Sequence, residues 1–234
     1  MTTARSGPAF AIIVAAGRSE RMDGIDKVFA PLMGRPLLAW TLAAFKACAD
    51  IDSVIIVASP SAVGRMRDFV KEWRFTNVVS VIAGGEQRQD SVRAGLDAAS
   101  DAAIVVIHDA ARPLVTPDLI SRGIELARET GAALCAIPSR DTVKRVAGEP
   151  PHVVETPDRT QMWLAQTPQV FDRGLLLAAH ERSTNHATDD AALVEASGGE
   201  VRVYEGAASN LKITTQEDLI VAEALLRERF EPSS

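Results

Sequence analysis

The chain has 234 residues, of which 47% are hydrophobic and 24% charged, and its formal net charge at pH 7 is −6. These values are ordinary for a globular protein, and they exclude a disordered chain, a collagen and a coiled coil. The length predicts one sizeable domain whose core is large enough to fold without disulfides. The acidic net charge also counts against a nucleic-acid-binding protein, because such proteins usually carry a surplus of Lys and Arg.

The two cysteines, Cys48 and Cys135, each lie in an apolar segment, and we expect both to be buried free thiols. Two cysteines cannot form a disulfide framework, and unpaired thiols agree with a reducing compartment. The apolar runs are shorter than the ~20 residues that a membrane-spanning helix requires, and residues 1–8 lack the apolar stretch of a signal peptide. We therefore expect a cytoplasmic protein that binds neither membranes nor nucleic acids.

Short apolar runs with β-strand composition alternate with amphipathic stretches in the first part of the chain. Strands are predicted at residues 10–16, 53–58, 78–83, 103–107 and 132–137, and helices at residues 36–49, 61–73, 90–99 and 117–130. Strands that are buried on both faces read as continuous apolar runs. The alternation therefore predicts an α/β fold, with a mostly parallel sheet covered by helices on both faces.

The alternation stops at Pro138. Two short segments of alternating polarity follow at residues 141–146 and 152–155, and one Gly and two Pro residues separate them. This pattern predicts a β-hairpin that stands off the sheet as an arm, over about residues 138–160. Because a two-stranded ribbon is only marginally stable by itself, we expect the arm to pack on a second copy of the chain in a homodimer.

The alternation of strands and helices resumes near residue 173. Helices are predicted at residues 173–182, 189–197 and 216–229, and a strand at residues 201–205. Thr215 precedes the last helix and Asp218 follows three residues later, which is the pattern of a capping box. No internal repeat or low-complexity tract divides the chain, so residues 1–234 are predicted to form a single domain.

A loop of small and basic residues follows the first predicted strand, at the edge of an open α/β sheet where ligands bind. Its members are Ala15, Ala16, Gly17, Arg18, Arg21 and Lys27. Backbone N–H groups of such a loop form an anion nest, and the cations neutralise phosphate oxygens. The loop is suited to a triphosphate, and a solvated surface loop with incidental cations is the alternative. Ser19 stands where a dinucleotide fingerprint needs Gly, and the second strand ends in Ala58-Ser59 without the acid that binds a ribose, so an NAD-dependent oxidoreductase is disfavoured. The loop is not a Walker A loop either, because no Gly-Lys-Ser/Thr follows Gly17 at the required spacing.

Further motifs follow this loop in chain order. They are Gly84-Gly85-Glu86-x-Arg88-x-Asp90-Ser91, His108-Asp109-Ala110-Ala111-Arg112-Pro113, Arg140-Asp141-Thr142-Val143-Lys144, Asp158-Arg159, Gln166-Thr167-Pro168-Gln169, Thr188-Asp189-Asp190-Ala191 and Asn210-Leu211-Lys212-Ile213-Thr214. Together with the loop, they resemble the 2-C-methyl-D-erythritol 4-phosphate cytidylyltransferases of the sugar-phosphate nucleotidyltransferase superfamily, over about residues 11–224. The resemblance implies a Rossmann-like nucleotidyltransferase fold with a protruding β-arm. It also implies a CTP-dependent transferase of the non-mevalonate isoprenoid pathway.

The resemblance implies a role for each matching residue. The nucleotide is expected to contact Ala15, Ala16, Gly17, Arg18, Gly84, Gly85, Glu86, Ser91 and Ala110. The catalytic residues are expected to be Arg21, Lys27 and Lys212. The acceptor, a polyol phosphate, is expected to contact Asp109, Arg112, Thr167 and, across the dimer interface, Thr142 and Arg159. Mg²⁺ is the implied cofactor, with Asp109 as the candidate ligand.

Other interpretations of these residues remain open. The two glycines of the second motif, with Ser91, also fit a plain turn and helix N-cap. His108 beside Asp109 suggests a general base, but the attacking phosphate is already ionised at pH 7, so we expect a packed core histidine. Residues 188–190, with His186 nearby, fit a helix N-cap with acids in the first turn better than a metal cluster.

Two other functions also remain open. Ribitol 5-phosphate cytidylyltransferases share these motifs, so the acceptor is not fixed by the residues alone. A non-catalytic nucleotide-binding module on the same fold is the second alternative, and the joint presence of Arg21, Lys27, Asp109 and Lys212 argues against it. The sequence departs from the family pattern at Ser19, Val28 and Ser209, and none of these departures removes a charge that the chemistry requires.

Overall fold

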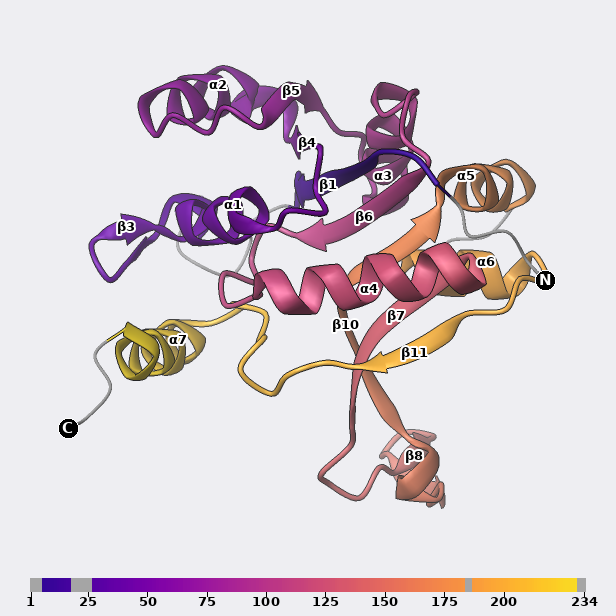
Figure 1. Ribbon diagram of the computed structural model, residues 1–234. Helices are drawn as coiled ribbons and strands as arrows, with labels where there is room; N and C mark the ends of the chain where they lie inside the picture. Colours follow the sequence, from indigo (N-terminus) through magenta and orange to yellow (C-terminus); the bar gives the residue numbers. More distant parts are fainter. Residues whose placement is uncertain (1–5, 18–26, 184–186, 231–234) are drawn as a thin grey trace.

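A twisted central sheet organises the computed structural model, which describes residues 6–17, 27–183 and 187–230 (Figure 1). The strand order is β11-β7-β10-β6-β1-β4-β5. The bounds are β1 Ala9–Ala15, β4 Ser53–Ala58, β5 Val78–Ala83, β6 Ile104–Asp109, β7 Ala132–Pro138, β10 Trp163–Asp172 and β11 Arg202–Glu205. Every pairing within this seven-stranded sheet is parallel except the two that β10 makes. The predicted α/β fold with a mostly parallel sheet is confirmed.

Helices cover both faces of this sheet (Figure 1). One face carries α1 (Leu37–Ala47), α2 (Val63–Glu72) and α4 (Pro117–Thr130), and the other carries α3 (Arg88–Ala98), α5 (Arg173–Arg182) and α6 (Asp190–Ala196). Neighbouring residues of β1 enter opposite hydrophobic clusters, since Ile13 packs with the first set of helices and Ile12 with the second. Successive side chains of a strand point to opposite faces of the sheet. A strand that is covered on both faces therefore needs apolar residues at every position.

The last helix, α7 (Gln216–Phe230), packs on a third hydrophobic cluster beside the small hairpin of β2 (Pro31–Leu32) and β3 (Arg35–Pro36). The predicted capping box is present, because Asp218 N donates to Thr215 Oγ1 at 3.2 Å and Thr215 N donates to Asp218 Oδ2 at 2.8 Å. Single 3₁₀ turns occupy Lys27–Phe29, Pro60–Ala62 and Arg159–Gln161. None of the helices that the structure describes is long and apolar enough to cross a membrane.

Strand β10 was not predicted from the sequence. It runs antiparallel between β6 and β7, and its centre is buried. Polar residues and Pro168 interrupt its apolar pattern, and a proline in the middle of a run argues against a central strand. The structure accommodates them with a shift of register between Ala165 and Gln169. As a result, Thr167 and Gln169 lie inside the sheet beside β6.

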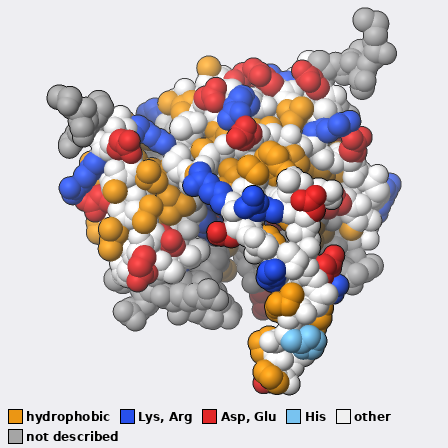
Figure 2. Space-filling view, turned by 90° about the horizontal axis from the view of Figure 1, so that it is seen from below, with side chains coloured by type: hydrophobic (Ala, Val, Ile, Leu, Met, Phe, Trp, Pro, Cys, Tyr) orange, Lys and Arg blue, Asp and Glu red, His pale blue; other side chains and the backbone are white. Residues whose placement is uncertain are grey.

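The predicted arm is present as β8 (Arg145–Ala147) and β9 (His152–Glu155), which pair antiparallel. It projects from the body beyond β7 and β10 (Figure 1), and the space-filling view shows hydrophobic side chains on this protrusion (Figure 2). Several large hydrophobic side chains on the arm and at its base are exposed: Val146, Val153, Val154, Trp163 and Leu164. Both cysteines are free and buried, as expected.

Candidate active site

A pocket of about 290 Å³ opens where β1 and β6 reach their carboxyl ends and where the loop after β5 leads into α3. Most of the predicted site residues line it: Ala15, Ala16, Gly17, Lys27, Gly85, Glu86, Ser91, Asp109, Ala110 and Lys212. Open α/β sheets bind ligands in this position because several strands end there together. The structure therefore brings together residues that are far apart in the sequence.

Among the described residues, five predicted site residues do not line the pocket: Gly84, Arg112, Thr142, Arg159 and Thr167. Arg112 and Thr167 are buried and are not part of the pocket wall. Thr142 and Arg159 lie on the exposed arm, where Arg159 Nη1 donates to Arg140 O at 3.1 Å, and neither residue lines the pocket of its own chain. Arg18 and Arg21 lie outside the described residues.

Asp109 is surrounded by cations. Lys212 Nζ lies 2.9 Å from Asp109 Oδ2, Arg112 Nε 3.6 Å from the same oxygen, and Arg88 Nε 3.9 Å from Oδ1. Burial by itself would raise the pKa of the Asp109 carboxyl, but Lys212, Arg88 and Arg112 outweigh this effect and hold the pKa below its usual value. Asp109 is therefore a carboxylate at neutral pH, in spite of its burial.

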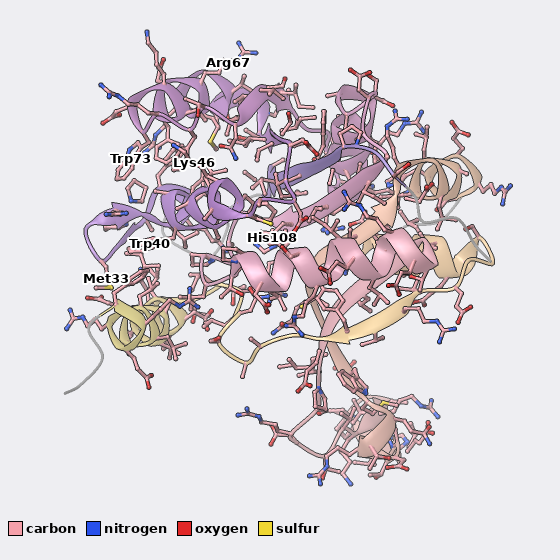
Figure 3. All side chains as sticks on the ribbon, viewed as in Figure 1. Met33, Trp40, Lys46, Arg67, Trp73 and His108 are labelled. Atoms are coloured by element: carbon pink, nitrogen blue, oxygen red, sulfur yellow. The ribbon has the colours of Figure 1, made fainter. Side chains whose placement is uncertain are left out.

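His108 is a fully buried core residue, as predicted, and lies between α1 and α4 (Figure 3). Its Nε2 lies 3.2 Å from Arg112 O and its Nδ1 lies 3.0 Å from Thr167 Oγ1. A carbonyl oxygen only accepts, so Nε2 must carry the proton and Nδ1 must accept from the Thr167 hydroxyl. Thr167 Oγ1 in turn accepts from Asp109 N at 3.1 Å. Burial lowers the pKa of His108 to about 4, so the ring is neutral and supports the backbone of Asp109.

The two glycines after β5 allow loops to pack closely. A Cβ on Gly84 would lie 2.8 Å from Ala16 Cβ and would overlap the Ser91 side chain, and a Cβ on Gly85 would overlap Asp90. Real Cβ contacts are not this short, so glycine is needed at both positions. The segment also forms a turn and a helix N-cap, but the capping residue is Gln87 and not Ser91. Gln87 forms a capping box with Asp90 at the start of α3.

Arg88 is a pocket residue that the sequence indicated only as a member of a motif, without a role. Its Nη1 donates to Asp190 Oδ2 at 2.5 Å. Burial would lower the pKa of the Arg88 guanidinium, but the carboxylates of Asp190 and Asp109 raise it above its ordinary value. The signal available in the sequence was its place in the Gly84–Ser91 motif, just before the helix predicted at residues 90–99.

The segment 188–190 acts as a helix cap, as expected. Asp189 is the N-cap of α6 and accepts from Ala192 N at 2.9 Å. Asp190 differs from a solvated first-turn acid, because it is completely buried and pairs with Arg88. No group of three possible metal ligands occurs in the part of the chain that the structure describes, and His186 lies outside that part.

The charge of the pocket suits a polyphosphate. Lys27, Arg88 and Lys212 line it, against the carboxylates of Glu86 and Asp109. Preorganised cations in a concave, partly desolvated site stabilise an anion more strongly than the same cations in water. The pocket can therefore hold a nucleoside triphosphate and neutralise charge that develops on its phosphates.

The sequence matches the family model for 2-C-methyl-D-erythritol 4-phosphate cytidylyltransferase over residues 9–228. It is 45% identical to the protein of that name from Dehalococcoides mccartyi strain CBDB1, over 93% of this chain and 95% of the relative. It is 43% identical to the one from Halalkalibacterium halodurans, over 93% of this chain and 96% of the relative.

Solved structures agree with the sequence relatives. The crystal structure of 4-diphosphocytidyl-2C-methyl-D-erythritol synthase from Anaerococcus prevotii superposes with a TM-score of 0.83 at 33% identity, covering 94% of this chain and 96% of that one. The crystal structure of 2-C-methyl-D-erythritol 4-phosphate cytidylyltransferase from Thermus thermophilus gives 0.76 at 37% identity, covering 92% and 98%. With its fold, its pocket and these relatives in agreement, this chain belongs to the 2-C-methyl-D-erythritol 4-phosphate cytidylyltransferase family.

Proposed function

We propose that this protein transfers CMP from CTP to 2-C-methyl-D-erythritol 4-phosphate, which yields 4-CDP-2-C-methyl-D-erythritol and diphosphate. The observation that carries the proposal is the pocket, in which Lys27, Asp109 and Lys212 meet at the carboxyl ends of the strands. The family relationship supplies the identity of both substrates.

In the proposed reaction, an oxygen of the acceptor phosphate attacks the α-phosphorus of CTP. A new P–O bond forms on one side, and the bond to the leaving diphosphate breaks on the other. The protein contributes positioning and charge stabilisation more than covalent chemistry. Lys27 and Lys212 neutralise the crowded phosphates, and Arg21 is expected to join them. No side chain has to remove a proton from the nucleophile, which agrees with the burial of His108.

Mg²⁺ is part of the proposal. Mg²⁺ prefers oxygen ligands and is usually held by one or two carboxylates together with substrate phosphates. Asp109 fits this pattern, because it lines the pocket and its low pKa keeps it ionised. When bound, the ion would neutralise negative charge on the nucleotide. Lys212, which pairs with Asp109, would remain available to the same phosphates.

A homodimer formed through the arm is the third part of the proposal. The exposed hydrophobic side chains of β8 and β9 support it, because a two-stranded ribbon needs a partner surface. In the dimer, Thr142 and Arg159 would reach the acceptor phosphate bound to the partner. We also propose a cytoplasmic location, which suits a chain whose two cysteines are free thiols.

The test is the release of diphosphate from CTP and Mg²⁺ with 2-C-methyl-D-erythritol 4-phosphate and ribitol 5-phosphate offered separately. Turnover with the first acceptor alone supports the proposal. Turnover with the second alone retains the mechanism and contradicts the substrate. No turnover with either leaves a nucleotide-binding module as the better description.

A further inference from the structure

A buried ion pair links the pocket to helix α6. The side chain of Asp190 is 1% exposed, and Arg88, whose side chain is 29% exposed, reaches from it to the pocket wall. We propose that Asp190 is a positioning residue, which holds the Arg88 guanidinium at the nucleotide side of the pocket and so strengthens the binding of CTP. This inference rests on the proposed function and adds a residue outside the pocket to it.

Arg88 lies between two carboxylates that differ in their surroundings. Its Nη1 donates to Asp190 Oδ2 at 2.5 Å, whereas its Nε lies 3.9 Å from Asp109 Oδ1. The first contact is a short charge-assisted hydrogen bond, and the second is longer than a hydrogen bond. Asp190 therefore fixes the guanidinium, and Asp109 keeps its close contact with Lys212.

Both sequence neighbours of Asp190 are bonded to the sheet, Asp189 through its side chain and Ala191 through its backbone N–H. Gln169 of β10 donates from Nε2 to Asp189 Oδ2 at 2.9 Å and accepts at Oε1 from Ala191 N at 3.0 Å. These two bonds flank Asp190 on both sides in the sequence. Since Gln169 lies opposite Ile107 of β6, the position of Asp190 is tied to the strand that ends in Asp109.

A third group approaches Asp190 without bonding to it. His180 Nε2 lies 3.8 Å from Asp190 Oδ1, and neither atom has a hydrogen-bond partner among the described residues. Arg88 is therefore the principal partner of this buried carboxylate. A buried carboxylate requires compensation, so the pair constrains Arg88 more strongly than an exposed ion pair would.

The position of Arg88 indicates which substrate it serves. It lines the pocket beside Gly85, Glu86 and Ser91, the segment expected to contact the nucleotide. If Asp190 loses its charge, the guanidinium is free to rotate toward Asp109, and the nucleotide side of the pocket loses a fixed cation. Lys212 keeps its own contact with Asp109, so the change is confined to the side of the pocket that Arg88 lines.

The first experiment compares the wild-type enzyme with Asp190→Asn, in which an amide of the same shape replaces the carboxylate. We expect the KM for CTP to rise about tenfold, the lower end of the loss in affinity that metal sites show when a carboxylate orienting a ligand side chain is removed. The KM for the acceptor should stay close to the wild-type value, whereas the melting temperature should fall, because the substitution breaks a buried ion pair. An equal rise in both KM values is the result of a loosened fold and would overturn the proposal. Asp118→Asn is the matched control, because Asp118 pairs with Arg122 at 3.1 Å on the exposed surface.

A double-mutant cycle tests whether the effect passes through Arg88. Arg88→Lys keeps the charge but removes the fork that bonds Asp190, so it should raise the KM for CTP by a similar factor. In that background, Asp190→Asn should have little further effect. Additive losses would show that Asp190 acts by another route.

Two further measurements test the inference even if the Asp190→Asn variant does not fold or if the proposed function is wrong. If Asp190→Asn does not fold, Arg88→Lys decides alone, and a normal KM for CTP contradicts the proposal. If the wild-type enzyme does not turn over the acceptor, the proposed function fails separately. Calorimetric titration of wild type and Asp190→Asn with CTP then shows whether the affinity falls about tenfold as expected or stays unchanged, which would overturn the inference.

Discussion

The Asp109 carboxylate in the pocket pairs with cations of its own chain, whereas the arm exposes apolar side chains that the described part of the chain does not cover. Asp109 is held by Lys212, Arg112 and Arg88, which come from three separate segments. On the arm, Val146 and Val153 are 54% and 56% exposed although they face each other in the hairpin. The charges around Asp109 are thus paired within one chain, whereas the apolar side chains of the arm stay exposed and, in the proposed dimer, would be covered by the partner. Changes in the two regions should therefore affect different properties.

The largest expected effect is in the pocket. Lys27→Ala should lower kcat about 100- to 1000-fold, or roughly 3–4 kcal/mol, because a preorganised cation next to the phosphates is lost. The melting temperature and the oligomeric state should not change, because Lys27 lies at the pocket surface. Steady-state kinetics and thermal denaturation measure both. A normal kcat would refute the catalytic role of Lys27.

The buried His108 behind the pocket should make the stability of the protein depend on pH. The pKa of His108 is 6.5 in the unfolded chain and about 4 in the folded protein. As pH falls from 6.5 to 4, the unfolded chain binds a proton that the folded protein does not. The free energy of unfolding should therefore decrease with falling pH, by roughly 3 kcal/mol over this range. Urea denaturation at several pH values measures the slope, and His108→Asn should flatten it. An unchanged slope in the variant contradicts this account.

On the arm, Arg159→Ala should raise the KM for the acceptor about 10- to 100-fold, the usual cost of a hydrogen bond to a charged group. The KM for CTP should change little, because Arg159 does not line the pocket of its own chain. Arg145→Ala is the matched control, since Arg145 pairs with Glu155 at 2.7 Å on the same arm. Equal changes in both KM values would contradict the separation of pocket and arm.

The smallest expected effect concerns the apolar surface of the arm. Val146→Ser and Val153→Ser should each weaken the dimer about tenfold, if burial of a Val side chain contributes about 1.5 kcal/mol. Sedimentation velocity over a concentration series measures the dissociation constant. Val79→Ser, on an exposed side chain of the edge strand β5, is the control. A wild-type chain that stays monomeric at micromolar concentration would remove the basis of this prediction.

The sequence predicted the parallel strands well, because their apolar runs are continuous and their helices have clear periodicity. It missed β10, because Gln166, Thr167 and Gln169 are polar and Pro168 interrupts the run. These polar residues are buried because they bond to neighbouring elements, and Thr167 with Asp109 N is an example. Such partners are distant in the sequence, so no local pattern reports them.

In the candidate site, too, contacts between residues that are distant in the sequence could not be predicted from local patterns. The small and basic residues around the pocket were predicted from motifs, and most of them line it. The direction of each side chain was not predictable: the sequence left open whether Arg112 holds an anion or Asp109, and in the structure its Nε lies 3.6 Å from Asp109 Oδ2. The pairing of Arg88 with Asp190 joins residues 102 positions apart. Only the fold brings that pair together.

Strand β10 begins beside the arm and passes the pocket. Trp163 is exposed near the arm, Thr167 supports Asp109, and Gln169 anchors α6. An insertion or deletion between these residues would shift those on one side of it relative to the others, and a shift of one residue turns each shifted side chain to the opposite face. The turn at residues 148–151 is exposed and lies at the far end of the hairpin. Homologous chains can therefore vary in length at the tip of the arm, whereas the spacing from its base to Gln169 has to stay constant.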